Sequence, residues 1–110
     1  MKAFDHALSI SCDEHGPRFD LAVDLLLRQK KFVVLDGRIA FYQTTENIEC
    51  EVISQWNSDG TQPQIFQREY EAAKVMFDAS TLGKVLTGHK LRWSVVQDYG
   101  MGRSEVWHAG

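Results

Sequence analysis

The residues best suited to bind a ligand or a partner lie in the last twenty positions, LRWSVVQDYGMGRSEVWHAG. There Asp98, Tyr99 and Arg103 surround two glycines. An arginine can pair bidentately with a carboxylate or a phosphate, and a tyrosine can stack or donate a hydrogen bond. We therefore take six residues as the candidate binding site for a ligand or partner: Trp93, Asp98, Tyr99, Arg103, Trp107 and His108.

The spacing of the same stretch predicts a β-hairpin. If Gly100 and Met101 form a two-residue loop, Gly100 takes the first central position of a type II′ turn, which needs a positive φ. A four-residue loop over 99–102 gives the same register. The predicted cross-strand pairs are Asp98 with Arg103, Gln97 with Ser104, Val96 with Glu105, Val95 with Val106, Ser94 with Trp107 and Trp93 with His108. A cross-strand pair of Asp98 and Arg103, worth about 0.2–1 kcal/mol, is the purely structural interpretation of this tip.

Four consecutive residues, Cys12 to His15, offer potential metal ligands. A tetrahedral zinc site needs two more, and Cys50 is one of the few candidates. Alternation places Cys50 on the core face of its predicted strand, where a thiol behaves as a small hydrophobic group. We therefore predict neither a metal nor a cofactor. Asp13 and Glu14 are expected to form an acidic loop at the positive end of the first helix.

Signatures of catalysis are weak. No G-x-S-x-G elbow or Cys-His signature surrounds any serine or cysteine. The carboxylates Glu49 and Glu51 alternate along one strand, so we interpret them as a solvated face rather than an acid–base pair. The two glycines around Met101 match only G-x-G and lead into a strand, unlike a phosphate-binding loop. The sequence thus favours a protein that is not an enzyme.

Composition and charge narrow the class of protein. The chain has 110 residues, 44% hydrophobic and 25% charged, which predicts one ordered globular domain over 1–110. Fifteen acidic residues against twelve basic ones give a net charge of −3, so we expect no nucleic-acid partner. No apolar run is long enough to span a membrane, and the first residues lack the apolar core of a signal peptide. Two cysteines fit a reduced compartment, and we expect a cytoplasmic protein.

Apolar spacing and turn residues predict the order of elements. The expected elements are an arm or short strand at 1–16, a helix at 17–30, a hairpin at 32–42, a strand at 48–56, a possible strand at 64–67, helices at 68–77 and 80–87, and the terminal hairpin. In the first hairpin, a type I′ turn at Asp36-Gly37 places Phe32, Val34, Ile39 and Phe41 on the core face. In the next strand Ile48, Cys50 and Val52 share that face. One side of the helix at 68–77 carries Tyr70, Ala73, Met76 and Phe77. Leu82, Val85 and Leu86 are expected to point inward from the helix at 80–87.

This order predicts an α+β fold: a single antiparallel sheet of five or six strands, with two hairpins, packed on two to three helices. We see no β-α-β alternation that would call for parallel strands. The order of one helix, three strands, a helix and two strands resembles that of type III secretion chaperones, which are small, acidic and dimeric. Those chaperones have a closing helix that this chain lacks, and the resemblance lies in element order alone.

The aromatic content suggests a binding role. Three tryptophans, three tyrosines and six phenylalanines are many for a small chain, and partly exposed aromatic residues are enriched in interface cores. We predict a non-catalytic interaction module, an accessory or orphan protein of bacterial or mobile-element type, that binds a protein partner or itself as a homodimer through a sheet face. The alternative is a small-molecule-binding protein or small enzyme. It would have an apolar pocket between sheet and helices, with Tyr42, Asp98, Arg103 and His108 as its polar groups.

Overall fold

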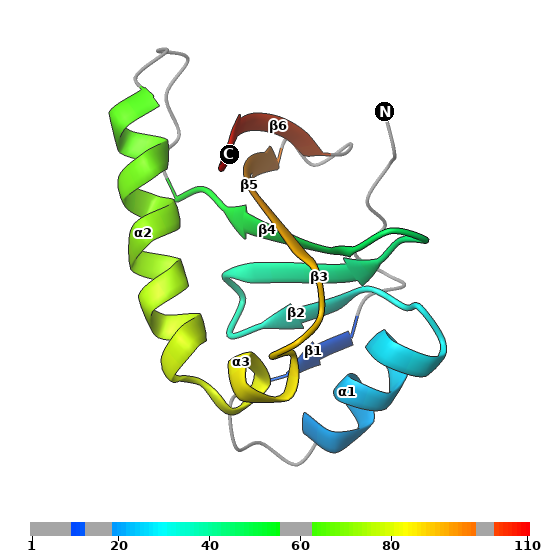
Figure 1. Ribbon diagram of the computed structural model, residues 1–110. Coiled ribbons are helices and arrows are strands. Elements are labelled where there is room, and N and C mark those ends of the chain that lie inside the picture. The colour runs from blue at the N-terminus through cyan, green and yellow to red at the C-terminus, as the bar shows by residue number, and fades with distance from the viewer. Residues whose placement is uncertain (1–9, 13–18, 56–62, 99–102) are drawn as a thin grey trace.

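The strands of this protein lie in space in the same order as in the chain. The computed structural model describes residues 10–12, 19–55, 63–98 and 103–110, and within these six strands form one sheet, ordered β1-β2-β3-β4-β5-β6 (Figure 1). The strands are β1 (Ile10–Cys12), β2 (Val33–Leu35), β3 (Ile39–Gln43), β4 (Ile48–Ile53), β5 (Leu91–Asp98) and β6 (Arg103–His108). The helices are α1 (Phe19–Arg28), α2 (Pro63–Ala79) and α3 (Thr81–Val85). None of these helices combines the length and apolarity needed to cross a membrane.

The chain follows the same β-α-β-β path twice. The first path is β1-α1-β2-β3 and the second is β4-α2-α3-β5-β6. In each path the helical connection joins two parallel strands and a hairpin follows, while β3 and β4 join the two halves as an antiparallel pair. Helix α1 packs on β1–β3 and α2 on β4–β6, so each helix covers the strands of its own half.

The α+β class, the two hairpins and the three helices confirm the prediction, but the sheet is mixed rather than wholly antiparallel. A helix laid across a sheet returns the chain to the end where the previous strand began, so the next strand runs parallel. The first parallel pair is easily missed because β1 has only three residues. The strand expected at 64–67 was wrong, because these residues continue the helix that begins at Pro63, a residue suited to a first helical turn.

The main core lies between the sheet and the three helices. Its buried strand residues alternate as expected in β4, where Ile48, Cys50 and Val52 are at most 4% exposed. A chain of aromatic rings links the sheet to α2: Phe77 lies 5.6 Å from Phe41 and 5.1 Å from Trp93, measured between ring centroids. Full burial of one such side chain contributes about 1.5–3 kcal/mol to stability, so α2 is held mainly by these contacts.

The turn between β2 and β3 forms as predicted, but the strands pair one residue out of the predicted register. Asp36 and Gly37 both have a positive φ, and the Arg38 N–H donates to the Leu35 carbonyl oxygen over 3.0 Å. A two-residue turn would continue with a ladder pair of Leu35 and Arg38. Instead the ladder begins one residue later, and Leu35 pairs with Ile39. Because a shift of one residue exchanges the faces of one strand, Val33 and Leu35 join the main core. The residues expected there, Phe32 and Val34, lie in a smaller cluster on the other side of the sheet.

A β-bulge changes the register of the terminal hairpin. The pairs Asp98–Arg103, Gln97–Ser104 and Val96–Glu105 confirm the prediction. The register then shifts between Val95 and Val96, so that Val106 is an extra residue in β6. Beyond it, Trp107 pairs with Val95 and His108 with Ser94, so the predicted pairs Val95–Val106, Ser94–Trp107 and Trp93–His108 were wrong. The extra residue moves Trp107 from the far face of the sheet to the face that carries the helices.

The short helix α3 is fitted against the end of α2. Ser80 caps it: its hydroxyl donates to the Phe77 carbonyl oxygen over 2.6 Å and accepts from the Gly83 N–H over 2.9 Å. Leu82 is buried as predicted, but Val85 is 40% exposed, because a helix of five residues turns only one edge toward the core.

We expect Gly83→Ala to destabilise the protein. A Cβ atom at Gly83 would overlap the carbonyl oxygen of Phe77, which belongs to the backbone and can move only if α3 shifts on α2. Overpacking of this kind costs about 1–3 kcal/mol in the free energy of unfolding, measurable by urea denaturation. The matched control is Lys84→Ala, at the adjacent exposed position. Equal stability of the two variants would contradict the close packing of α3 on α2.

Candidate functional site

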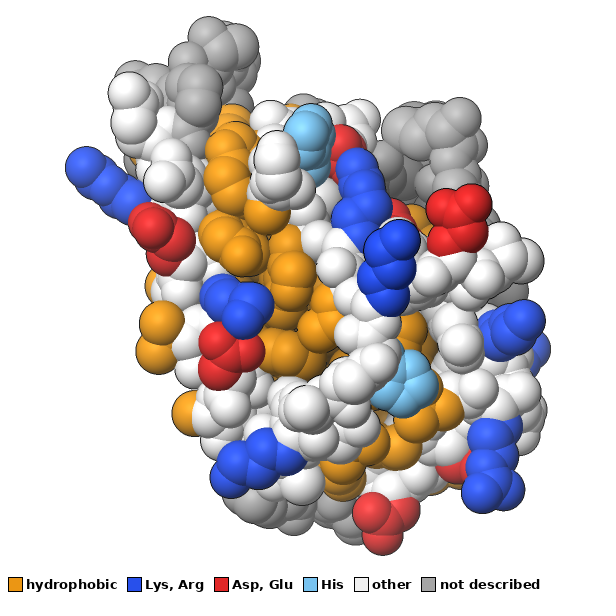
Figure 2. Space-filling view, in the orientation of Figure 1, with side chains coloured by type: hydrophobic (Ala, Val, Ile, Leu, Met, Phe, Trp, Pro, Cys, Tyr) orange, Lys and Arg blue, Asp and Glu red, His pale blue; other side chains and the backbone are white. Residues whose placement is uncertain are grey.

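Aromatic side chains form a partly exposed band between α2 and the terminal hairpin. The ring of Tyr70, on α2, lies 5.0 Å from Trp107 and 5.7 Å from Trp93. Tyr70 and Trp107 are half-buried, whereas Trp93 is 6% exposed and belongs to the core. We call these three residues the aromatic band. Figure 2 shows hydrophobic side chains gathered along the line where α2 meets β5 and β6.

Charged groups border the aromatic band on α2. The Lys74 ammonium lies 6.0 Å from the centroid of a Trp93 ring and forms an ion pair of 2.8 Å with Asp78. A cation over an aromatic face contributes about 0.5–1 kcal/mol at an exposed site, and an i,i+4 ion pair adds about 0.3–0.5 kcal/mol. These contacts hold the ammonium close to the edge of the band, so the band has a polar rim on its helical side.

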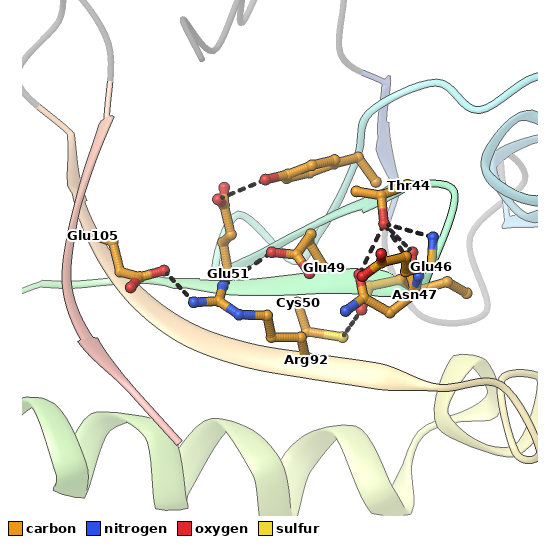
Figure 3. Close-up of polar contacts among 10 residues, drawn as sticks. Thr44, Glu46, Asn47, Glu49, Cys50, Glu51, Arg92 and Glu105 are labelled. Atoms are coloured by element: carbon orange, nitrogen blue, oxygen red, sulfur yellow. Dashed lines mark hydrogen bonds and ion pairs between the residues drawn. The ribbon is translucent and has the colours of Figure 1, made fainter. Parts of the chain in front are cut away.

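A second arrangement, on the opposite face of the sheet, is built around Arg92 (Figure 3). Its guanidinium donates through Nη1 to Glu49 and through Nη2 to Glu105, each over 3.0 Å. The hydrogen bond to Glu105, more than any other contact, raises the pKa of Arg92 above its ordinary value. Arg92 on β5 thus links β4 to β6. Because its guanidinium is paired with two carboxylates, it is not available to bind a phosphate.

The carboxylates of β4 are less solvated than their alternation suggested. The side chain of Glu49 is only 12% exposed, and the Tyr42 hydroxyl donates to Glu51 over 3.3 Å. The expectation of a solvated face was therefore wrong for Glu49, because the guanidinium of Arg92 allows the carboxylate to be partly buried. Each carboxylate has a cation or a hydroxyl donor as its partner, which favours a structural role for both over an acid–base pair. We call the ion pairs of Arg92 with Glu49 and Glu105 the charged brace.

The structure brings only part of the predicted site together. Trp93 and Trp107 meet through Tyr70, which lies on the apolar side of its helix and is not among the six predicted site residues. Its signal is its position in the apolar stripe of α2, between Phe66 and Ala73, where a large ring can reach the neighbouring strands. His108 is exposed and pairs with Ser94 on the other face of the sheet.

The tip of the hairpin is described only in part. The backbones of Asp98 and Arg103 pair across the two strands, as predicted. Their side chains lie outside the described structure, as do Tyr99 and the rest of 99–102. The predicted binding roles of Asp98, Tyr99 and Arg103 therefore stay predictions.

Two small hollows are lined by described residues. One of about 120 Å³ lies between β4 and α2, lined by residues that include Arg38, Gln55 and Glu69. Glu69 is already engaged there, accepting hydrogen bonds from the Ser54 hydroxyl over 2.5 Å and from the Gln55 N–H over 2.7 Å. Another of about 100 Å³ lies beside the β3–β4 turn. Pockets for small molecules usually measure about 300–1,000 Å³, and neither hollow reaches the tryptophans.

The described residues contain no cluster of metal ligands, and their one described cysteine side chain, Cys50, is buried. Among them no three His, Cys, Asp or Glu side chains are grouped as metal ligands would be. Asp13, Glu14 and His15 lie outside the described part, as does the side chain of Cys12. Burial, and next the nearby Glu49 carboxylate, raises the pKa of the Cys50 thiol far above its ordinary value. Cys50 therefore stays protonated and behaves as a core residue, as the sequence predicted.

Comparisons with known proteins give no family. No family model matches the chain, and no curated protein or solved structure is significantly similar to it. The likeness to type III secretion chaperones thus stays one of element order.

We expect Arg92→Met to destabilise the protein at neutral pH, because it leaves the partly buried Glu49 carboxylate without its guanidinium partner. Loss of one member of such a pair costs about 1–3 kcal/mol in the free energy of unfolding. The second substitution in Glu49→Gln/Arg92→Met removes the stranded charge and should restore part of that loss. Disruption of the exposed Lys74–Asp78 pair by Asp78→Ala is the control and should cost less than about 0.5 kcal/mol. A double variant that is less stable than Arg92→Met would contradict the claim that Arg92 compensates the partly buried charge of Glu49.

Proposed function

We propose that this protein is a small non-catalytic interaction module and that the aromatic band, beside strand β6, is its contact surface. The observation that carries the proposal is the position of Tyr70 and Trp107: two half-buried rings in contact with each other, next to a strand at the edge of the sheet. The partner is a protein, or a second copy of the chain. We place this activity in the cytoplasm, in keeping with the reduced state of the buried Cys50.

The chemistry of the band suits a protein partner. Tyrosine and tryptophan offer large rigid rings at a low cost in conformational entropy, and they dominate the energetic centres of protein interfaces. Val106 and Ala109 are partly buried apolar neighbours of the core at the same end of the sheet. A polar rim around an apolar centre, as Lys74 and Asp78 provide here, is the usual layout of such interfaces.

The sheet face opposite the helices gives less support as a contact surface than the sequence suggested. Four of its residues, Val34, Ala40, Ser94 and Val96, are at most 6% exposed, so their side chains are already covered. The two hollows lined by described residues give no support to the small-molecule alternative, because they are small and lie away from Trp93 and Trp107. Tyr42, expected in such a pocket, instead donates to Glu51 on β4.

We expect Trp107→Ala to weaken partner binding about tenfold or more, the usual loss when a central aromatic anchor is removed. The measurement is affinity capture from the cells that make the protein, followed by titration calorimetry with the captured protein and by sizing of the chain alone. Val75→Ala, which truncates an apolar residue that is 71% exposed on α2, is the matched control and should bind as the wild type does. Thermal unfolding of each variant checks that the fold is kept.

Two results would contradict this proposal. One is a wild-type chain that stays monomeric and retains no protein. The other is a folded Trp107→Ala variant that binds its partner as tightly as the wild type.

A further inference from the structure

Strand β6 ends the sheet, with β5 as its one neighbour among the described strands. The opposite edge, β1, has three residues, whereas β6 has six. An edge strand presents main-chain donors and acceptors on its outer side, ready to pair with another strand. The longer of the two edges is also the one that adjoins the aromatic band.

Two hydrogen bonds show which residues of β6 present their main chain outward. The Ala109 N–H donates to the Trp93 carbonyl oxygen over 3.1 Å. In an antiparallel ladder this bond flanks a non-hydrogen-bonded pair, here Ser94 and His108, so the N–H and C=O of His108 point away from β5.

Glu105 presents its main chain outward for a related reason. The Ser54 N–H donates to the Val96 carbonyl oxygen over 2.9 Å, so the main-chain groups of Val96 face β4. Val96 therefore makes no ladder bond to its partner Glu105, whose N–H and C=O point away from β5.

The bulge gives these outward groups a regular spacing. Glu105 and His108 are three positions apart in β6, but they lie opposite Val96 and Ser94, which are two positions apart in β5. Two positions is the repeat at which hydrogen-bonded pairs recur in a regular antiparallel ladder. Bulges commonly protect an edge strand from pairing. Here, however, Glu105 and His108 keep the spacing of two hydrogen-bonded pairs, so they can pair with a strand that has the same extra residue.

We propose that a second copy of this chain pairs antiparallel with β6 across a twofold axis, which would continue the sheet from one copy into the other. Glu105 would face the partner's His108, and His108 would face the partner's Glu105, with main-chain hydrogen bonds at both positions. This inference rests on the proposed function, since it names the partner of the same surface.

The side chains in this register are complementary. Glu105 and His108 are both exposed, and both lie on the face of the sheet that carries Arg92, so a carboxylate meets an imidazole twice. On the helix face Trp107 meets Val106 of the partner subunit, so two apolar positions face each other beside the aromatic band. A register shifted by one residue would place Glu105 opposite an apolar side chain, which favours the pairing of Glu105 with His108.

Substitutions at position 108 test this pairing. The N–H of His108 is not used by the ladder with β5, so His108→Pro removes an outward donor and leaves the fold intact. We expect the wild type to sediment as a dimer, His108→Pro as a monomer of unchanged thermal stability, and His108→Ala, which keeps the N–H, as a dimer. His108→Glu, which faces a like charge, should raise the dimer dissociation constant about tenfold or more relative to His108→Lys.

The possible outcomes separate this proposal from the proposed function. A wild type that stays monomeric over a wide range of concentrations overturns the pairing, and if it still binds another protein through Trp107, the proposed function stands. A monomer that captures nothing overturns both. A dimer that survives in folded His108→Pro but not in Trp107→Ala overturns the pairing and keeps the aromatic band as the interface.

Discussion

The contacts that β6 makes on both faces of the sheet depend on one extra residue in this strand. In a regular strand the side chains of positions 105 and 107 point to the same face of the sheet. Here Glu105 bonds to Arg92 on one face, while Trp107 packs on Tyr70 on the other. The bulge at Val106 allows both contacts, because it reverses the alternation between them. Without it, either the charged brace or the aromatic band would lose its member from β6.

Two sets of contacts hold the second β-α-β-β path together, and the first set also joins it to β3. On the helix side, rings from Phe41 through Phe77 to Trp93 join the sheet to α2. On the other side, Arg92 joins β4 to β6 across β5. The first set is apolar and stabilises the fold by burial, whereas the second links the strands side by side and allows Glu49 to be partly buried. With both faces of this half occupied, the contact surface that is left lies at its border, where the band meets the edge strand.

The sequence predicted the elements that have long apolar patterns, but it did not predict the strand register where a single extra residue shifts it. The alternation of Ile48, Cys50 and Val52 predicted the core face of β4, and the glycines of the terminal hairpin predicted its register as far as Val96. The bulge could not be foreseen, because no glycine or other local signature marks Val106. The contacts that depend on the bulge are made by its neighbours, Trp107 with Tyr70 and Glu105 with Arg92. Tyr70 itself was recognised as an inward residue but not as a site residue, since only the packing of α2 on β6 brings it to Trp107.

The central claim is that the bulge sets the register beyond Val96, and proton NMR tests it directly. Residues of a non-hydrogen-bonded antiparallel pair have Cα atoms only ~4.5 Å apart, so their Hα atoms give a strong cross-strand nuclear Overhauser effect. The bulged register predicts this signal between Ser94 and His108. A strong Hα–Hα signal between Ser94 and Trp107 instead would mean a regular hairpin. It would contradict the placement of Trp107 beside Tyr70 and, with it, the proposed contact surface.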